Sequence, residues 1–528
     1  MYIQTHTKRV GEKTYQSVLL VEGYRENGKV KHRTLANLSA LAPEMIEEMK
    51  KIIKGAKALS LDELETQQGK SCGALIVIKE ICKRLGISSA LGNSANALLA
   101  IVMIMGRIIT QGSRLHLAES FQQDQAIEEV LGIAKFDENQ LYKSLIWLAD
   151  NQSAIEKKLF KIRNKESIEE IFLYDVTSSY LEGQENELAE YGYNRDGKRG
   201  KKQLVIGLLT DKEGYPVSIE VFLGNTSDPK TVSSQLKKLK DLYGVKKVVF
   251  VGDRGMLKKA QISELLAHND DKDFAWHYIT AITKSQIETL IKKDVLQLGL
   301  FDNDLAEVEF DGVRYVFRRN PVQAHFIANN RASKIQKVLS FVDKSNNYLL
   351  LHPKANLDIA LNNLLSYIKK LNLTDCFSIS SSDRKISISL LDKDFSLDGC
   401  YVLKTDLASS ILDKDTVHSH YKDLAKVESA FRTIKTSFEE IRPLFLRKQK
   451  QTRGHVFICM LSYMVLKYLS DHLNDLAFTR SFVIDTLDNI SFLSFNFNGL
   501  FIKKLPSSLL AHQQLILDRL NIKLPSSL

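Results

Sequence analysis

The run Ile171-Phe-Leu-Tyr-Asp-Val-Thr177 is a short apolar segment that carries a carboxylate, Asp175, towards its end. A second run of the same kind, Val248-Val-Phe-Val-Gly-Asp-Arg-Gly-Met256, presents Asp253 in the same way. Short apolar runs rich in β-branched and aromatic residues are typical of buried strands. Further along, a helix-like stretch carries Glu428. Two aspartates leaving neighbouring strands and a glutamate on a helix packed beside them are expected to converge on one point.

Three converging carboxylates without a Cys or His partner form a site of hard oxygen ligands, which suits Mg²⁺ or Mn²⁺. Two such ions can hold a phosphodiester and activate the attacking oxygen. Asp175, Asp253 and Glu428 are therefore the candidate catalytic residues and also the candidate metal ligands. This pattern favours a metal-dependent enzyme that acts on nucleic acid. Two Mg²⁺ ions are expected, and Mn²⁺ is expected to substitute for them.

The sequence around the first two carboxylates predicts a mixed α/β core at residues 166–285. Strand-like runs occur at 169–176, 202–210, 216–223, 246–252 and 275–283. Within the second run, the stretch from Gln203 to Leu209 is apolar after its first residue, as a central strand should be. The third run alternates polar and apolar residues, as a half-exposed strand should. Asp228-Pro229 predicts a helix start with Asp228 as the N-cap. The expected order is three strands in succession, then helix, strand, helix and strand.

The spacing of the carboxylates predicts an insertion at residues 286–403. Asp175 and Asp253 are 78 residues apart, whereas 175 residues separate Asp253 from Glu428. Compact domains rarely contain long loops without structure of their own, so the extra length is expected to fold. Strand-like pieces recur through this block, and we interpret it as a β-rich insertion domain. Helices are also expected within it at 322–345 and 355–371. The core is expected to resume at 404–475 with the helix that carries Glu428.

The regions on either side of the core differ from it in pattern. Residues 1–40 alternate as strands do, and a hairpin is expected at Asn27-Gly28. Residues 41–165 show helical periodicity and are interpreted as a DNA-binding domain, while residues 476–528 form a weakly patterned C-terminal region. Helices are expected at 43–53, 73–86, 96–110, 124–132 and 139–162. The hairpin is basic, and two interpretations stay open: a solvated edge, or an arm that contacts DNA.

Charge and composition fit a folded protein with a polyanionic partner. The net charge is +10 and the sequence pI is about 9.0, with 44% hydrophobic and 26% charged residues. Lys and Arg side chains that neutralise phosphates drive DNA binding, so double-stranded DNA is the expected partner. The five cysteines are scattered without a CxxC pair, which argues against a zinc module and favours a reducing cytoplasm. No membrane partner is expected, because the apolar stretches at 97–109 and 456–469 are too short to span a bilayer.

Together these segments resemble the core of insertion-sequence DDE transposases, within the RNase H-like, retroviral-integrase superfamily. The matching stretches are Tyr174–Thr177, Lys201–Leu209, Gly224–Asp228, Gly252–Met256 and Tyr421–Lys435. The resemblance implies an RNase H-like mixed sheet with a β-rich insertion between the fifth strand and the Glu helix. It also implies a bacterial, nucleoid-associated homodimer that carries out DNA transposition. Such an enzyme would cleave the terminal inverted repeats of a mobile element and transfer the strands into target DNA.

The family's signature around its glutamate is Tyr, two residues, Arg, three residues, Glu, six residues, Lys. This chain has Tyr421, Leu424, Glu428 and Lys435 at those positions, so leucine stands where a phosphate-binding arginine is expected. Successive members of the set Tyr421, Glu428 and Lys435 are seven residues apart, so the three are expected to share one helix face.

Cations near the carboxylates are the candidate DNA contacts. Lys426 or Arg432 is the expected substitute for the missing arginine. The loop Gly197-Lys-Arg-Gly-Lys-Lys202 is either a solvated turn or a contact with the DNA backbone. The full set of candidate DNA-binding residues is Tyr421, Lys435, Arg432, Arg254, Lys198 and Arg199. His418 and His420 have no ligand cluster near them in sequence and are expected at a helix entry or on the surface.

Two other functions stay open from the sequence. One is a metal-dependent DNA endonuclease that cuts without strand transfer. The other is a non-catalytic, DNA-binding relic of a transposase, for which Leu424 is the only indication.

Overall fold

The computed structural model describes residues 1–10, 13–55, 65–165, 170–183, 185–193, 195, 197–198, 200–302, 305–435, 446–497, 500–506 and 508–525. The chain divides into two compact units. The first comprises residues 1–70, 491–508 and 525–528, and the second comprises residues 71–490 and 509–524. The finer division into six segments stays a prediction.

The first unit begins with a three-stranded antiparallel sheet in the order β1-β2-β3. Its elements are β1 (Tyr2–Val10), β2 (Lys13–Glu26), β3 (Lys29–Asn37) and the helix α1 (Pro43–Ile53) that follows. Asn27 and Gly28 join β2 to β3 with positive φ angles, as a tight hairpin turn requires, which confirms the predicted hairpin. A second sheet has the order β16-β15-β4 and was not predicted, because its strands come from distant parts of the sequence. They are β4 (Glu65–Ser71), β15 (Ser491–Phe497) and β16 (Leu500–Lys504).

The second unit begins with helices, as predicted. They are α2 (Gly73–Arg84), α3 (Ile87–Leu91), α4 (Ala95–Ile109), α5 (Arg114–His116), η2 (Leu117–Phe121), α6 (Gln122–Asp124), α7 (Ile127–Leu131) and α8 (Glu138–Arg163). α16 (Gln449–His472) packs against α8, and Gly454 permits this approach, since a Cβ there would lie 2.0 Å from the carbonyl oxygen of Leu145. α17 (Arg480–Asp488) and α18 (Ala511–Arg519) complete the helical part.

In the described part of the chain, no single helix is long and apolar enough to cross a membrane. α4 and the segment at 114–124, bent by 106° from it, reach that length and apolarity only when taken together.

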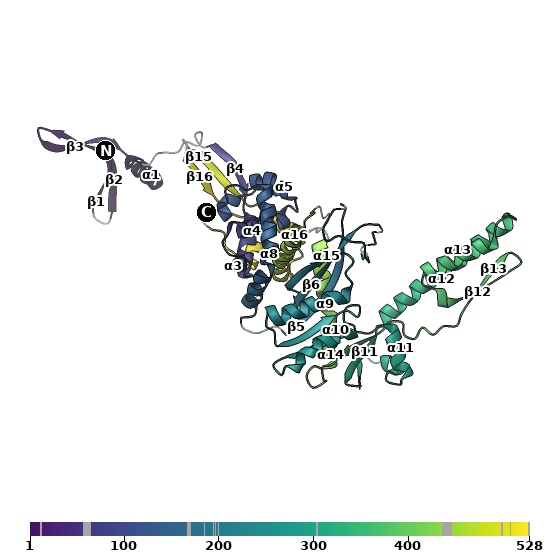
Figure 1. The fold of residues 1–528 in the computed structure, drawn as a ribbon. Helices are drawn as coiled ribbons and strands as arrows, with labels where there is room; N and C mark the ends of the chain where they lie inside the picture. Colours follow the sequence, from purple (N-terminus) through teal and green to yellow (C-terminus); the bar gives the residue numbers. More distant parts are fainter. Residues whose placement is uncertain are drawn as a thin grey trace. The chain divides into compact units, whose positions relative to one another are not determined.

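The centre of the second unit is an eight-stranded sheet in the order β10-β11-β14-β9-β8-β5-β6-β7 (Figure 1). The core strands are β5 (Ile171–Tyr180), β6 (Gln203–Asp211), β7 (Pro216–Phe222), β8 (Lys247–Gly252) and β9 (Ala275–Ala281). β5, β6 and β7 are antiparallel neighbours, and β5, β8 and β9 are parallel. This is the RNase H-like arrangement, and it confirms the five predicted core strands to within a few residues.

Helices cover the sheet by burying apolar side chains against it. On one face, α9 (Asp228–Lys237), the π-helical segment η3 (Lys238–Leu242) and α10 (Lys259–Leu266) share a hydrophobic cluster with β5 and β8. A short 3-10 segment, η4 (Ala267–Asp270), follows α10. Ser227, and not Asp228 as predicted, is the N-cap of α9, so Asp228 is the first residue of the helix. The side chain of Asp228 pairs with Arg195.

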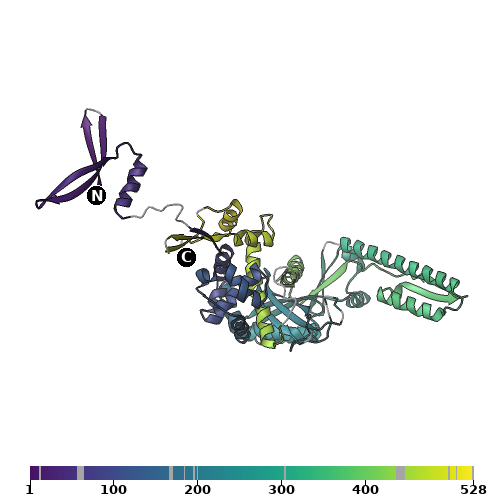
Figure 2. The ribbon, with the colours of Figure 1, turned by 90° about the horizontal axis from the view of Figure 1, so that it is seen from above.

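The block at 286–403 differs from the predicted β-rich domain. Three of its strands, β10 (Ala306–Phe310), β11 (Val313–Arg319) and β14 (Cys400–Thr405), extend the core sheet beyond β9. An open sheet edge is costly, and β14 covers the edge of β9. The remainder is mostly helical: α12 (Pro321–Leu351) and α13 (Leu357–Lys370), both predicted, pack with the hairpin β12 (Phe377–Ser382) and β13 (Lys385–Leu390) around a core of their own (Figure 2). Shorter elements complete the block: α11 (Lys284–Lys292), η5 (Leu298–Asp302) and η6 (Thr374–Cys376).

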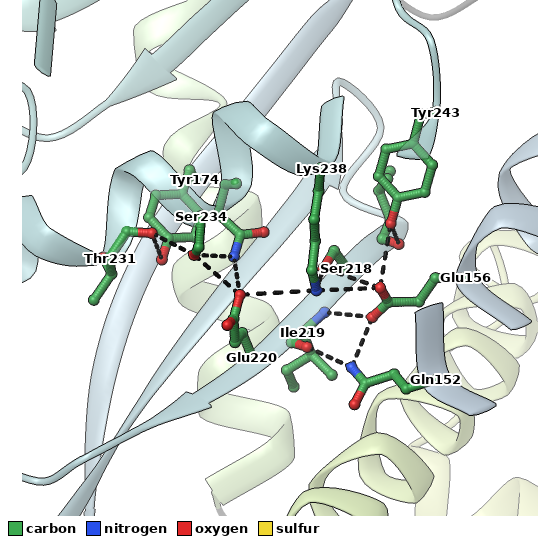
Figure 3. A network of polar contacts seen from close by, with 12 residues as sticks. Gln152, Glu156, Tyr174, Ser218, Ile219, Glu220, Thr231, Ser234, Lys238 and Tyr243 are labelled. Atoms are coloured by element: carbon green, nitrogen blue, oxygen red, sulfur yellow. Dashed lines mark hydrogen bonds and ion pairs between the residues drawn. The ribbon is translucent and has the colours of Figure 1, made fainter. Parts of the chain in front are cut away.

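A buried polar network ties α8 to the core (Figure 3). The carboxylate of Glu156, which is fully buried, lies 3.2 Å from Nζ of Lys238 and accepts hydrogen bonds from Tyr243 and from the backbone of Ile219. Lys238 also donates to Ser218 on β7. A buried carboxylate is tolerated only when it is paired in this way.

Replacing Lys238 by Met is expected to lower the free energy of unfolding by about 3 kcal/mol, because Glu156 would stay buried without its cation. Urea denaturation followed by circular dichroism measures this change. Lys237→Met, an exposed neighbour, is the matched control and should change stability by less than about 0.5 kcal/mol. Equal effects of the two substitutions would contradict the prediction.

Candidate active site

The sheet places Asp175 and Asp253 side by side. β5 and β8 are parallel neighbours whose last paired residues are Tyr174 and Gly252, so an aspartate follows on each strand. Tyr174 packs into the cluster beneath α9 and α10, and side chains alternate along a strand, so Asp175 points to the opposite face. β8 ends at Gly252, but β6 continues to pair with β5 as far as Tyr180. Asp175 therefore lies in the middle of its strand, and not towards its end as predicted.

The helix α15 (Leu424–Lys435) brings Glu428 to this place. It packs on β5 and β6 through buried side chains such as Val427 and Ile434. Asp175, Asp253 and Glu428 line one pocket of about 380 Å³. The three predicted carboxylates thus share one pocket.

The helix predicted over 421–435 is two helices in the structure. α14 (Lys414–Lys422) ends just before Asp423, and the backbone N–H of Lys426 donates to the carbonyl of Asp423, which starts a new turn. Tyr421 is therefore not on the same helix as Glu428. Its hydroxyl donates a hydrogen bond of 3.2 Å to Oδ1 of Asp253, and it lines the carboxylate pocket from α14.

The pKa of the Asp175 carboxyl is raised above its ordinary value. Burial raises its pKa to about 6, and the negative charges of Glu428 and Asp253 add to the rise. The backbone N–H of Val176 and the guanidinium of Arg195 oppose it. A divalent cation among these carboxylates would relieve the repulsion, and a set of acceptor-only oxygens fits such an ion.

The carboxylates face a common pocket without being in coordinating contact. Among the residues that the structure describes, no three His, Cys, Asp or Glu side chains are close enough together to hold a metal ion. Asp253 and Glu428 are exposed, so their side chains have room to turn towards Asp175. Binding of a cation would therefore be accompanied by side-chain rotation.

The position of the missing arginine is occupied by an apolar side chain. Leu424 is buried and lines the carboxylate pocket. Lys426 is engaged elsewhere, since its Nζ donates to the carbonyl of Lys212 at 2.6 Å and lies 2.9 Å from Asp423. Arg432 is exposed and does not line the pocket. Neither predicted substitute therefore places its charge in the pocket.

The other candidate DNA contacts surround the pocket or lie apart from it. Arg254 is exposed and partly offsets the rise that burial causes in the pKa of Tyr421. Lys435 is on α15, two turns beyond Glu428. Nζ of Lys198 lies 5.8 Å from the ring centre of Tyr180. Arg199 is outside the described residues.

Several pocket residues were missed by sequence analysis. His418 was expected at a helix entry or on the surface, but it is buried and lines the pocket together with Asn320, Tyr401 and Lys422. Nε2 of His418 is in hydrogen-bond contact with the hydroxyl of Tyr401, and burial, then the charge of Lys422, lowers its pKa. Asn320 and Tyr401 belong to the block that was predicted to be a separate domain. Only the addition of β11 and β14 to the core sheet brings them here.

The strand order and the carboxylates on β5, after β8 and on α15 define an RNase H-like core of the kind that processes nucleic acids. Residues 166–465, more than half of the chain, match the transposase DDE domain, and the chain belongs to this family. Residues 3–67 match the N-terminal domain of IS1634 family transposases, so this is a DDE-type insertion-sequence transposase. The resemblance noted from the sequence is thereby confirmed.

Comparison with individual solved structures gives a transposase as a structural neighbour. No relative among curated proteins matches the chain. Among solved structures, the chain is similar to piggyBac transposase in a synaptic complex with hairpin DNA, with 10% sequence identity and a TM-score of 0.34. The similarity covers 80% of this chain and 82% of that chain.

Proposed function

We propose that this transposase cleaves DNA at the ends of its mobile element and joins the cleaved strands to target DNA in a reaction that requires divalent metal ions. The observation that carries this proposal is the convergence of Asp175, Asp253 and Glu428 on one pocket. The carboxylates come from three separate elements, and none of the three forms an ion pair with another residue in the described part of the chain.

In this proposal, Asp175, Asp253 and Glu428 are the catalytic residues and hold two Mg²⁺ ions, for which Mn²⁺ can substitute. When bound, the ions would favour in-line attack by water or a DNA 3′-hydroxyl on phosphorus. Tyr421 would fix the orientation of Asp253 through its hydrogen bond. Lys422, which also lines the pocket, would offer its charge to the phosphate oxygens.

The proposed partner is double-stranded DNA, first as the terminal inverted repeats of the element and then as target. A homodimer would bridge the two ends, and the helical segment at 41–165 would take part in recognising them. The net charge of +10 favours this polyanionic partner. The proposed setting is a bacterial cytoplasm, with the protein bound to the nucleoid when it acts.

We expect inverted repeats in the DNA that flanks the gene, and these repeats are the substrate for a test. The purified protein is incubated with end-bearing DNA, a supercoiled target plasmid and Mg²⁺, and the products are sequenced. We expect cleavage at the repeat boundary and joined products, and neither with EDTA or with a scrambled repeat. Cleavage without joined product would instead indicate an endonuclease. No cleavage with either Mg²⁺ or Mn²⁺ would indicate a DNA-binding relic.

A further inference from the structure

A second pocket, of about 320 Å³, lies beside the carboxylate pocket. Gly255 and Asp228 line it, and a Cβ placed on Gly255 would lie 3.8 Å from an Oδ atom of Asp228 and equally far from one of Asp253. The carboxylates of Asp228 and Asp253 therefore border the same small space. The second pocket therefore begins within a few ångströms of Asp253.

Arg195 supplies positive charge where the two pockets meet. Its guanidinium forms an ion pair with Asp228, and its side chain is 25% exposed, so a ligand can reach it. Its backbone N–H donates to Oγ of Ser178 at 3.0 Å, three residues beyond Asp175 on β5. The guanidinium is close enough to Asp175 to lower the pKa of that carboxyl. Arg195 thus brings positive charge near Asp175 from the loop after β5, although its side chain lines the second pocket and not the carboxylate pocket.

A buried amide, Gln203, forms part of the lining of the second pocket. Gln203 is only 1% exposed, and its Nε2 donates to the carbonyls of Tyr193 at 3.1 Å and Gly224 at 2.8 Å. This amide joins the segment before Arg195 to the loop before α9. Oε1 of Gln203 is buried and has no hydrogen-bond partner among the described residues. An unsatisfied buried acceptor is costly, so a donor from a ligand or water is expected there.

The rest of the lining suits a nucleotide. Lys258 adds a second cation, and Asn225 and Thr226 add an amide and a hydroxyl. The amino end of α9, where the N-cap residue makes no side-chain capping bond, favours an anion as well. Tyr193 is 82% exposed, and its ring centre lies 5.8 Å from the guanidinium carbon of Arg195. An exposed aromatic ring beside a cation is a typical stacking surface for a base.

We propose that the second pocket binds one nucleotide of the DNA strand that passes the carboxylates, with Arg195 and Lys258 on its phosphate and Tyr193 against its base. Asp228 is a positioning residue that holds the guanidinium until the phosphate replaces it. The inference rests on the proposed function in taking DNA as the ligand.

Binding in EDTA tests this inference independently of cleavage. The probe is a fluorescent duplex that carries the element end, nicked at the cleavage position, with single neutral methylphosphonates placed at successive positions around the nick. We expect Arg195→Ala to bind the unmodified probe about tenfold more weakly than wild type, because a charge-assisted contact is lost. Its plot of log affinity against log salt should be less steep by about 0.9. One methylphosphonate position should weaken wild-type binding strongly and weaken binding by Arg195→Ala much less, because only the contact with Lys258 is then left to lose.

Two further variants sharpen the test. Lys201→Ala, from the same loop, removes a cation that pairs with Glu182 and does not line the pocket, so it should keep the position-specific loss. Asp228→Asn should bind more tightly than wild type, because a competing carboxylate is removed, and this gain should vanish in Arg195→Ala/Asp228→Asn.

Three results would overturn the inference. They are unchanged binding by Arg195→Ala, the same methylphosphonate profile in Arg195→Ala as in wild type, and the same loss from Lys201→Ala as from Arg195→Ala. Thermal melting of each variant checks that it is folded. Failure of the proposed function would instead appear as absent cleavage in Mg²⁺ while binding in EDTA still follows this pattern.

Discussion

Asp175→Asn, Asp253→Asn and Glu428→Gln are each expected to reduce the rate of DNA cleavage by at least about 10³-fold. Each substitution keeps the size of the side chain but removes the charge that a divalent cation requires. The three carboxylates line one pocket, so the loss of any one should disable the site as a whole. Binding of end-bearing DNA in EDTA should stay within about threefold of wild type, because the substitutions remove negative charge and no cation.

Initial rates of strand cleavage in Mg²⁺, with binding measured on the same preparations, check this prediction. Asp415→Asn is the matched control, since Asp415 is an exposed carboxylate on α14 that does not line the pocket. It should cleave at the wild-type rate. Double variants should be no slower than the slowest single variant, because residues that act as a unit are not additive. Wild-type cleavage by any one of the three single variants would remove that residue from the mechanism.

The parts of the fold that follow from local pattern could be predicted from the sequence. The apolar runs that contain Asp175 and Asp253 have the composition of buried strands, and they form β5 and β8. The meeting of these two residues with Glu428 could also be predicted, because two adjacent strands and a helix that packs on them bring the three side chains to one place. These features depend on short stretches of chain whose apolar residues must be buried.

The predictions that were wrong concern features that depend on contacts between residues far apart in the sequence. Tyr401 reaches the pocket because β14 covers the edge of β9, and no local pattern in 286–403 reveals that pairing. The helix break at Asp423 leaves the periodicity of 421–435 almost unchanged, so the pattern alone predicted one helix. Arg195 stands in a loop with no regular period. Its ion pair with Asp228 could not be predicted, because it forms only where the β5–β6 loop meets the start of α9 in the folded chain.

The raised pKa of Asp175 predicts a stability that depends on pH. Burial, and then the charges of Glu428 and Asp253, raise its pKa to about 6 in the folded protein, against an ordinary value of 3.8. Between these values the folded state holds a proton that the unfolded chain has released. The stability of the metal-free protein therefore falls as the pH rises from about 4 to 6, and the loss is complete above that range. Asp175→Asn removes the penalty, so it should be more stable than wild type by roughly 1–3 kcal/mol at pH 7.5 and nearly equal to it at pH 4.

The same proton competes with a cation for Asp175. The affinity of the wild-type protein for Mn²⁺ should therefore fall by about tenfold for each pH unit below 6. Denaturation in EDTA at the two pH values, and Mn²⁺ titration by electron paramagnetic resonance, measure the two effects. Other titrating groups cancel in the difference between wild type and Asp175→Asn, and Asp415→Asn should show no such difference. If Asp175 had a purely structural role, its replacement by Asn would lower the free energy of unfolding of the protein. A gain in stability together with a loss of cleavage would mean that Asp175 destabilises the metal-free fold and is needed for the ion. A destabilised Asp175→Asn would contradict the raised pKa that burial and the neighbouring carboxylates give to Asp175.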